Sequence, residues 1–147
     1  MAWPNMKNRK DKKLIKTINF PPLGDDRGHL VSLEGQDTVP FEIKRVYYLF
    51  DTKENVSRGY HAHKDLEQIA ICVKGSCKFI LDDGYQRDEI LLSNATVGLY
   101  IGSLVWREMH DFTSDCVLLV LASQNYNEYD YIRDYQEFTG LIHASNK

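Results

Sequence analysis

No run of about 20 apolar residues occurs in the sequence, although a membrane-spanning helix needs that length. The charged residues at the start are not followed by the apolar core of a secretory signal peptide. Internal repeats and low-complexity linkers are absent too, so nothing suggests a repeat architecture or a second domain. We therefore expect one cytoplasmic domain with no membrane partner.

Cysteine is scarce, and the three that occur have no CxxC spacing. Cys72, Cys77 and Cys116 lie within or beside apolar segments. An odd number of cysteines in an intracellular chain argues against a disulfide framework. We expect buried, reduced thiols that pack as small apolar side chains, with no redox role.

A strong charge of either sign is also missing, since the 147 residues carry a formal net charge of -3. Such a chain has no overall attraction to nucleic acid, and we expect no nucleic-acid partner. The one basic cluster has no aromatic residues between its charges, which is typical of a solvated tail. We expect a flexible basic tail at residues 1–16 and a single folded domain at 17–147. The cluster consists of Lys7, Arg9, Lys10, Lys12, Lys13 and Lys16.

What the sequence does contain is a series of short β-rich segments separated by turn residues, typical of an antiparallel sandwich or barrel. Asp83-Gly84 is a strong hairpin signal, because glycine tolerates positive φ. Apolar residues at helical spacing predict a helix within Asn127–Ile142. We expect an all-β barrel with a short C-terminal helix. The expected strands are Phe41–Phe50, Gln68–Val73, Cys77–Leu81, Glu89–Leu92, Gly98–Ile101 and Cys116–Ser123.

Alternation along two strands predicts that polar side chains share the face of the apolar core, and His61, His63 and Glu67 have the same parity as Ile69, Ile71 and Val73. Burying several ionisable groups together costs several kcal/mol unless they pair or bind something, so such a group indicates a functional site. An apolar barrel with a polar mouth has the makeup of a small-molecule pocket. The side chains expected to point inward there are Arg45, Tyr47, His61, His63 and Glu67.

The spacing His61-x-His63-x3-Glu67 resembles the first motif of the cupin superfamily, whose metal-binding members add a histidine from a second motif. In this chain the matching position holds Arg107, a permanent cation that would repel a metal ion. His110 has the opposite strand parity and should face away. We therefore expect no metal and no other cofactor, which leaves the histidines for acid–base chemistry.

Four arginines lie near the inferred mouth of the pocket and suggest a phosphate-bearing ligand, because the guanidinium fork matches phosphate geometry. They are Arg27, Arg45, Arg58 and Arg107.

Five short strings resemble the dTDP-sugar 3,4-ketoisomerase family over nearly the whole chain. The strings are Ile43–Tyr48, Arg58–Lys64, Val97–Gly102, Glu108–Phe112 and Tyr129–Arg133.

The resemblance implies a homodimeric jelly-roll cupin enzyme that acts on dTDP-4-keto-6-deoxy-D-glucose. A base removes the C3 proton and a proton returns at C4 through an enediol, which yields a dTDP-3-keto-6-deoxy-hexose. The product leads to 3-amino-3,6-dideoxy sugars of surface polysaccharides such as O-antigen or S-layer glycans. The resemblance makes His61 the base, His63 an assistant and Tyr47 the proton shuttle. The residues expected to bind the substrate are Arg27, Arg45, Arg58, Glu67, Tyr100 and Arg107.

Family members with a gluco or a galacto product differ at the positions of Arg27 and Arg107. One group carries arginine at the first and histidine at the second, and the other carries tyrosine and arginine. This chain has arginine at both. Three alternatives stay open at this point: a dTDP-sugar 3,5-epimerase, a metal-dependent cupin oxygenase, and a sugar-nucleotide-binding cupin without catalysis.

Overall fold

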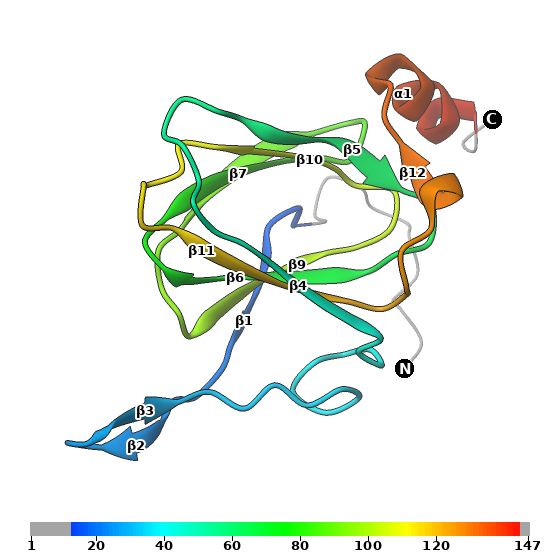
Figure 1. Ribbon diagram of the computed structural model, residues 1–147. Coiled ribbons are helices and arrows are strands. Elements are labelled where there is room, and N and C mark those ends of the chain that lie inside the picture. The colour runs from blue at the N-terminus through cyan, green and yellow to red at the C-terminus, as the bar shows by residue number, and fades with distance from the viewer. Residues whose placement is uncertain (1–12, 145–147) are drawn as a thin grey trace.

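The computed structural model describes residues 13–144, in which two five-stranded antiparallel sheets face each other (Figure 1). One sheet has the order β1-β9-β6-β11-β4, and the other β12-β5-β10-β7-β8. The strands of the first sheet are β1 (Lys16–Asn19), β9 (Val97–Ile101), β6 (Gln68–Lys74), β11 (Val117–Ala122) and β4 (Arg45–Leu49). Those of the second are β12 (Tyr131–Ile132), β5 (Arg58–His63), β10 (Trp106–His110), β7 (Cys77–Asp82) and β8 (Arg87–Leu92).

Two further elements lie outside the facing sheets (Figure 1). The hairpin of β2 (Leu23–Asp25) and β3 (Gly28–Leu30) projects away from the main body. Helix α1 (Tyr135–Ala144) follows a short 3-10 turn (Glu128–Asp130) and β12. The expected all-β class with a short C-terminal helix is thus confirmed, although the two sheets are not joined into a closed barrel.

The elements differ from the sequence prediction at several points, and β1, β2, β3 and β12 were not among the predicted strands. Strand β4 begins at Arg45 instead of Phe41, because Phe41 packs against the outer face of the first sheet. The predicted helix begins only at Tyr135, since residues 128–132 form the 3-10 turn and an edge strand instead. Strands β5 and β10 were not among the predicted strands.

The inward face of β6 was assigned wrongly from strand parity. Gln68 and Ala70 face the space between the sheets, whereas Ile69 and Ile71 pack outside the first sheet against Phe20. The chain leaves the strand conformation between β5 and β6, so the alternation that starts at the histidines does not continue into β6. Within β4 the assignment is confirmed, because Arg45, Tyr47 and Leu49 all line the interior.

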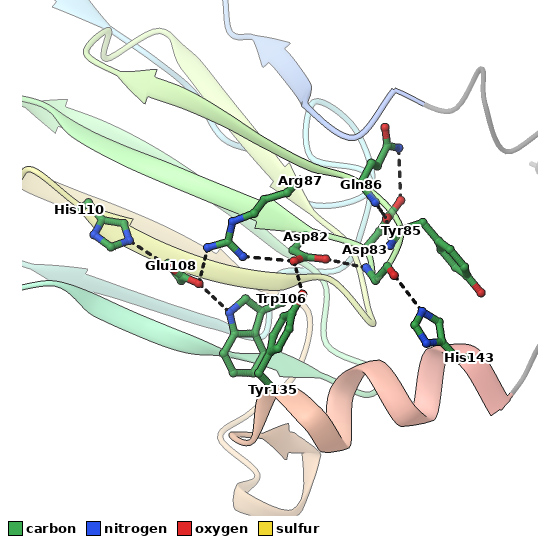
Figure 2. Close-up of polar contacts among 11 residues, drawn as sticks. Asp82, Asp83, Tyr85, Gln86, Arg87, Trp106, Glu108, His110, Tyr135 and His143 are labelled. Atoms are coloured by element: carbon green, nitrogen blue, oxygen red, sulfur yellow. Dashed lines mark hydrogen bonds and ion pairs between the residues drawn. The ribbon is translucent and has the colours of Figure 1, made fainter.

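Helix α1 is held to the second sheet by a polar network around Asp82 and Glu108 (Figure 2). The Tyr135 hydroxyl donates to Asp82 Oδ2 at 2.7 Å, and Arg87 bridges both carboxylates. The Trp106 ring packs against Tyr135 with 5.2 Å between ring centroids. Because both carboxylates are satisfied, the network fixes the helix and, through the chain before it, the position of β12.

No helix within residues 13–144 is long and apolar enough to cross a membrane. Most of the expected basic tail lies at residues 1–12, outside the described residues. Lys16, the last residue assigned to that tail, begins β1.

Candidate active site

A cavity of about 350 Å³ lies between the two sheets and takes polar side chains from both. This volume falls within the range of small-molecule sites. Its floor is apolar, formed by residues such as Ala70, Phe79 and Val120. The polar lining comes from β4 and β6 on one side and from β5, β10 and the β12 segment on the other. It consists of Arg45, Tyr47, Gln68, Arg58, His61, Arg107, Tyr131 and Arg133.

His61 and Arg107 are direct cross-strand partners of β5 and β10, so both side chains enter the cavity from one sheet. The register of this pair shifts immediately after Arg107, and Gly59 lies opposite Glu108. Gly59 has a φ of +93°, and a Cβ there would lie 3.0 Å from the Arg107 carbonyl oxygen. The irregularity therefore needs glycine, and it aims the imidazole and the guanidinium at the same space.

Burial lowers the pKa of His61 to about 4, and the positive charge of Arg107 acts in the same direction. A hydrogen bond with the Gly59 backbone opposes this shift but does not overcome it. The imidazole is therefore neutral at neutral pH, with a lone pair available to accept a proton. This is the form that a general base requires.

His63 is 1% exposed and is not part of the cavity lining, but its ring packs against that of His61 with 4.9 Å between centroids, and it forms a dyad with Asp130. Its Nδ1 lies 3.2 Å from Asp130 Oδ2, and burial lowers the pKa of His63 to about 2. Asp130 also accepts hydrogen bonds from the backbone N–H groups of Asp65 (2.9 Å) and Leu66 (3.2 Å). A neutral His63 thus donates Nδ1–H to the carboxylate, which fixes its tautomer and leaves Nε2 without a partner among residues 13–144.

A hydrogen-bond relay joins Arg107 to Tyr47 through Gln68. Arg107 Nη1 donates to Gln68 Oε1, and Gln68 Nε2 donates to the Tyr47 hydroxyl at 2.9 Å. Arg107 Nη2 donates to the Val105 carbonyl at 3.0 Å. Since the Tyr47 oxygen accepts from Gln68, its own proton is free to be donated to a ligand. Burial raises the pKa of Tyr47, so the phenol stays protonated.

The lining is strongly cationic, because no carboxylate occurs among the described residues that line the cavity. Arg107 is 2% exposed, and burial lowers its pKa to about 10, which still leaves it charged at neutral pH. Such a cavity attracts anions. The four cations are Arg45, Arg58, Arg107 and Arg133.

Three of the residues predicted to bind substrate lie elsewhere in this chain. Glu67 and Tyr100 are not in the cavity lining, because the Tyr100 hydroxyl donates to Glu67 on the outer face of the first sheet. The inward orientation expected for Glu67 was therefore wrong. Arg27 lies at the tip of the β2–β3 hairpin, with 87% of its side chain exposed and an ion pair to Asp25.

The position of Glu67, outside the cavity, also affects the metal motif. With Glu67 on the outer face, the motif's three ligand atoms do not meet in the described part of the chain. His110 faces outward, as its parity predicted, and contacts Glu108 and Ser57 there. The position that would complete a cupin metal site holds inward-facing Arg107, so the residues present do not fit a metal ion.

Sequence reasoning missed several polar residues of the site. Gln68 directly follows the cupin spacing, but the parity error assigned it to the outer face. Asp130, Tyr131 and Arg133 lie inside one of the family-like strings, where they were assigned to the terminal helix. Tyr131 is the cross-strand partner of His63, and Arg133 stacks over the Tyr131 ring at 4.1 Å.

Comparison with known proteins places this site in a family. The family described as WxcM-like, C-terminal (FdtA) matches residues 13–143. The TDP-4-oxo-6-deoxy-alpha-D-glucose-3,4-oxoisomerase of Aneurinibacillus thermoaerophilus is 56% identical over 131 residues, which cover 89% of this chain and 94% of that protein. The chain belongs to the sugar 3,4-ketoisomerase family.

Solved structures of other ketoisomerases superpose closely on this one. A histidine-to-asparagine mutant of the Thermoanaerobacterium thermosaccharolyticum enzyme, in complex with TDP-4-keto-6-deoxyglucose, is 46% identical with a TM-score of 0.86, covering 89% of this chain and 95% of that chain. The TDP-quinovose 3,4-ketoisomerase of Campylobacter jejuni is 50% identical with a TM-score of 0.84, covering 88% and 99%. The protein is therefore an isomerase built on the cupin fold, and the resemblance seen in its sequence is confirmed.

Proposed function

We propose that this ketoisomerase converts dTDP-4-keto-6-deoxy-D-glucose to a dTDP-3-keto-6-deoxy-hexose, with His61 as the catalytic base. The observation that carries the proposal is a neutral imidazole directly across from a buried guanidinium in a cationic cavity. The imidazole can accept a proton, and the guanidinium can stabilise the negative charge that then develops on oxygen. A diphosphate linkage suits the other arginines of the cavity.

The reaction is a proton transfer within the sugar. His61 removes the C3 proton, which the C4 ketone acidifies, and the electrons form an enediolate. Tyr47 donates its phenolic proton to the oxygen at C4 and takes one back from the oxygen at C3. Return of a proton to C4 gives the 3-ketone. His63 lies outside the cavity lining, so its proposed part, held by Asp130, is to assist the proton return through His61, against which its ring packs.

Arg107, Arg45 and Arg58 are proposed to bind the anionic parts of the substrate from within the same subunit. Glu67 and Tyr100 lie outside the lining, so their proposed contribution is indirect: their hydrogen bond supports the outer face of the strands that carry Gln68 and Ile101.

The catalytic unit is the single domain at residues 17–147, with no cofactor. The cytoplasm is the proposed location, because three buried free thiols suit a reducing compartment.

The product of such a reaction is suited to a later amino-group transfer at C3, because a ketone is the acceptor that a transaminase requires. We therefore propose that the enzyme serves 3-amino-3,6-dideoxy sugar synthesis for surface glycans. The comparisons favour a 3,4-ketoisomerase over the 3,5-epimerase and over a binding module without catalysis.

Solvent exchange tests the proposed reaction directly. When the protein is incubated with dTDP-4-keto-6-deoxyglucose in D₂O, NMR should show loss of the C3 proton signal and deuterium at C4 of the product. Deuterium at C5 would indicate an epimerase, and binding without exchange a sugar-nucleotide sensor; either result overturns the proposal. The vicinal couplings around C4, measured in H₂O, report whether the product is gluco or galacto.

The pH profile tests the assignment of the base. Because the pKa of His61 is lowered to about 4, the imidazole is unprotonated above that value and becomes inactive as the pH falls through it. We expect kcat/KM to hold constant from pH 7 down to about pH 5 and to fall below it, whereas an ordinary histidine would give a midpoint near 6.5. Circular dichroism at each pH shows that the fold is intact. An acidic midpoint near 6.5 would contradict the assignment.

A homodimer is part of the proposal, and the exposed hairpin supports it. Leu23 and Leu30 on the β2–β3 hairpin are each 58% exposed, although both are apolar. Strand β4 likewise exposes apolar residues, including Val46 and Tyr48. A second copy that covers these surfaces would bury them, and the projecting hairpin would carry Arg27 toward the partner's cavity.

Mixed dimers separate this arrangement from one in which Arg27 serves its own subunit. Arg27→Ala is expected to lower kcat/KM ~10–100-fold, since a hydrogen bond to a charged group contributes ~1.5–3 kcal/mol. Co-expression of Arg27→Ala with His61→Asn should then restore activity, because one site of each mixed dimer has His61 and the partner's intact arginine. Activity no higher than that of the Arg27→Ala dimer would show that Arg27 does not act across subunits.

A further inference from the structure

Three thiols meet inside the protein beyond the floor of the cavity. On β6 the inward residues are Gln68 and Ala70, which line the cavity, and then Cys72. On β7, Cys77 precedes Phe79 of the floor by two residues. Cys116 enters the same interior cluster just before β11. Three separate segments thus each place a cysteine in the same part of the core between the two sheets.

The three sulfur atoms are close enough to share one ligand. All three Sγ atoms lie within 4.8 Å of one another, and Cys72 and Cys116 Sγ are 3.4 Å apart. Thiolate–metal bonds are about 2.3 Å long, so three sulfurs around one centre stand ~4 Å apart. The triad needs only small side-chain adjustments to reach that geometry. This is the one group of three or more ligand-type residues found in the described part of the chain.

The surroundings of the triad restrict the ligand to one that leaves no net charge. The cysteines are at most 1% exposed and belong to an apolar core cluster, although Cys72 Sγ also donates to the Lys74 carbonyl at 3.3 Å. The negative charge of Asp115 acts on Cys72 and Cys116 and raises the cost of further negative charge there. Burial raises the pKa of Cys116 to about 12, whereas hydrogen bonding by Cys77 lowers the pKa of Cys72 to about 7. Three thiolates around a divalent ion would carry a net negative charge, which is costly in an apolar interior. A trivalent centre with three thiolates is neutral.

We propose that Cys72, Cys77 and Cys116 form a binding site for a soft trivalent ion, namely arsenic(III) taken up from arsenite. Arsenite at neutral pH is As(OH)₃. Three S–H and three As–O bonds break, three As–S bonds form, and each departing hydroxide leaves as water with a thiol proton. The oxidation states of arsenic and sulfur do not change. Binding cross-links β6, β7 and the segment before β11.

Arsenite titration of the reduced protein tests the proposal. Native mass spectrometry should show one arsenic per chain with the loss of three hydrogens, and X-ray absorption should show three sulfur neighbours. Thermal unfolding should shift upward with arsenite concentration, because the ligand binds the folded state. Absence of binding, or arsenic with one or two sulfur neighbours, overturns the site. Tighter binding of Zn²⁺ than of arsenite would also overturn it, since the charge argument would then be wrong.

A two-thiol probe provides the matched control. Cys77→Ala keeps the close pair Cys72 and Cys116, so it should still bind phenylarsine oxide, which takes two sulfurs. The same variant should lose ~10²-fold or more in arsenite affinity, because the third link is gone. Unchanged arsenite affinity contradicts the triad. Turnover and circular dichroism show whether Cys77→Ala is folded. If it is not, the number of hydrogens that the wild-type protein loses on binding one arsenic, measured by native mass spectrometry, still decides the question.

Discussion

Asparagine in place of His61 is expected to lower turnover ~10²–10⁴-fold while leaving nucleotide binding nearly unchanged. That range is the usual contribution of a well-placed general base. The amide is close in size to imidazole but cannot accept a proton at neutral pH. The His61 imidazole lines the cavity directly across from Arg107, and its pKa is lowered to about 4, so it is neutral at pH 7 and able to accept the C3 proton. Single-turnover kinetics and calorimetric titration with dTDP measure the two quantities separately.

The neighbouring histidine supplies the comparison for that result. His63→Asn should lose less turnover, because His63 is proposed to assist and not to remove the C3 proton. If His63→Asn abolished C3 exchange in D₂O and His61→Asn retained it, the two roles would have to be exchanged. His63 with Asp130 would then be the base, a possibility that the buried dyad makes chemically reasonable.

Methionine in place of Arg107 is expected to lower kcat/KM ~10–100-fold and to move the acidic limb of the pH profile upward. The first effect follows from the loss of a charge-assisted hydrogen bond to the developing oxyanion, worth ~1.5–3 kcal/mol. The second follows because Arg107 adds to burial in lowering the pKa of His61. Without that charge the pKa rises by the part that Arg107 contributes, so activity is lost at a higher pH as the solution is acidified. The relay to Gln68 and Tyr47 is also broken.

Lysine at the same position separates charge from geometry. Arg107→Lys retains the positive charge, so the acidic limb should stay near that of the native enzyme, while kcat/KM still falls because an ammonium cannot reproduce the two-pronged guanidinium. Profiles of kcat/KM from pH 4 to 8 for the three proteins give both readouts. An acidic limb that does not move in Arg107→Met would show that Arg107 does not set the basicity of His61.

In the proposed mechanism, a buried cation takes the place that a metal ion has in other cupins. In a metal cupin the ion supplies the positive charge that stabilises an oxyanion. Here a buried arginine holds that position on β10 and faces the histidine that would otherwise be a ligand. Burial lowers the pKa of His61, and the charge that would repel a metal lowers it further, so the proposed base and its electrostatic partner are tuned together.

The sequence by itself was sufficient for the fold class, the family and the central pair of the site. Short β-rich segments and Asp-Gly turns predicted the all-β architecture, because alternation and turn chemistry are local properties. The His61-x-His63 spacing and the arginine at 107 indicated acid–base chemistry, because ligand types and permanent charges are evident from residue identity alone. Arg45 and Tyr47 were assigned correctly, since β4 is regular from one residue to the other.

Only the tertiary structure decided which face each side chain occupies and which distant residues meet. The turn between β5 and β6 interrupts the alternation, so Gln68 lines the cavity and Glu67 does not. Asp130 reaches His63 because β12 pairs with β5, a contact between residues 67 positions apart. The three cysteines likewise meet only through strand packing. The alternation of side chains follows from the few residues of one strand, whereas these long-range contacts depend on how the two sheets pack around a shared core.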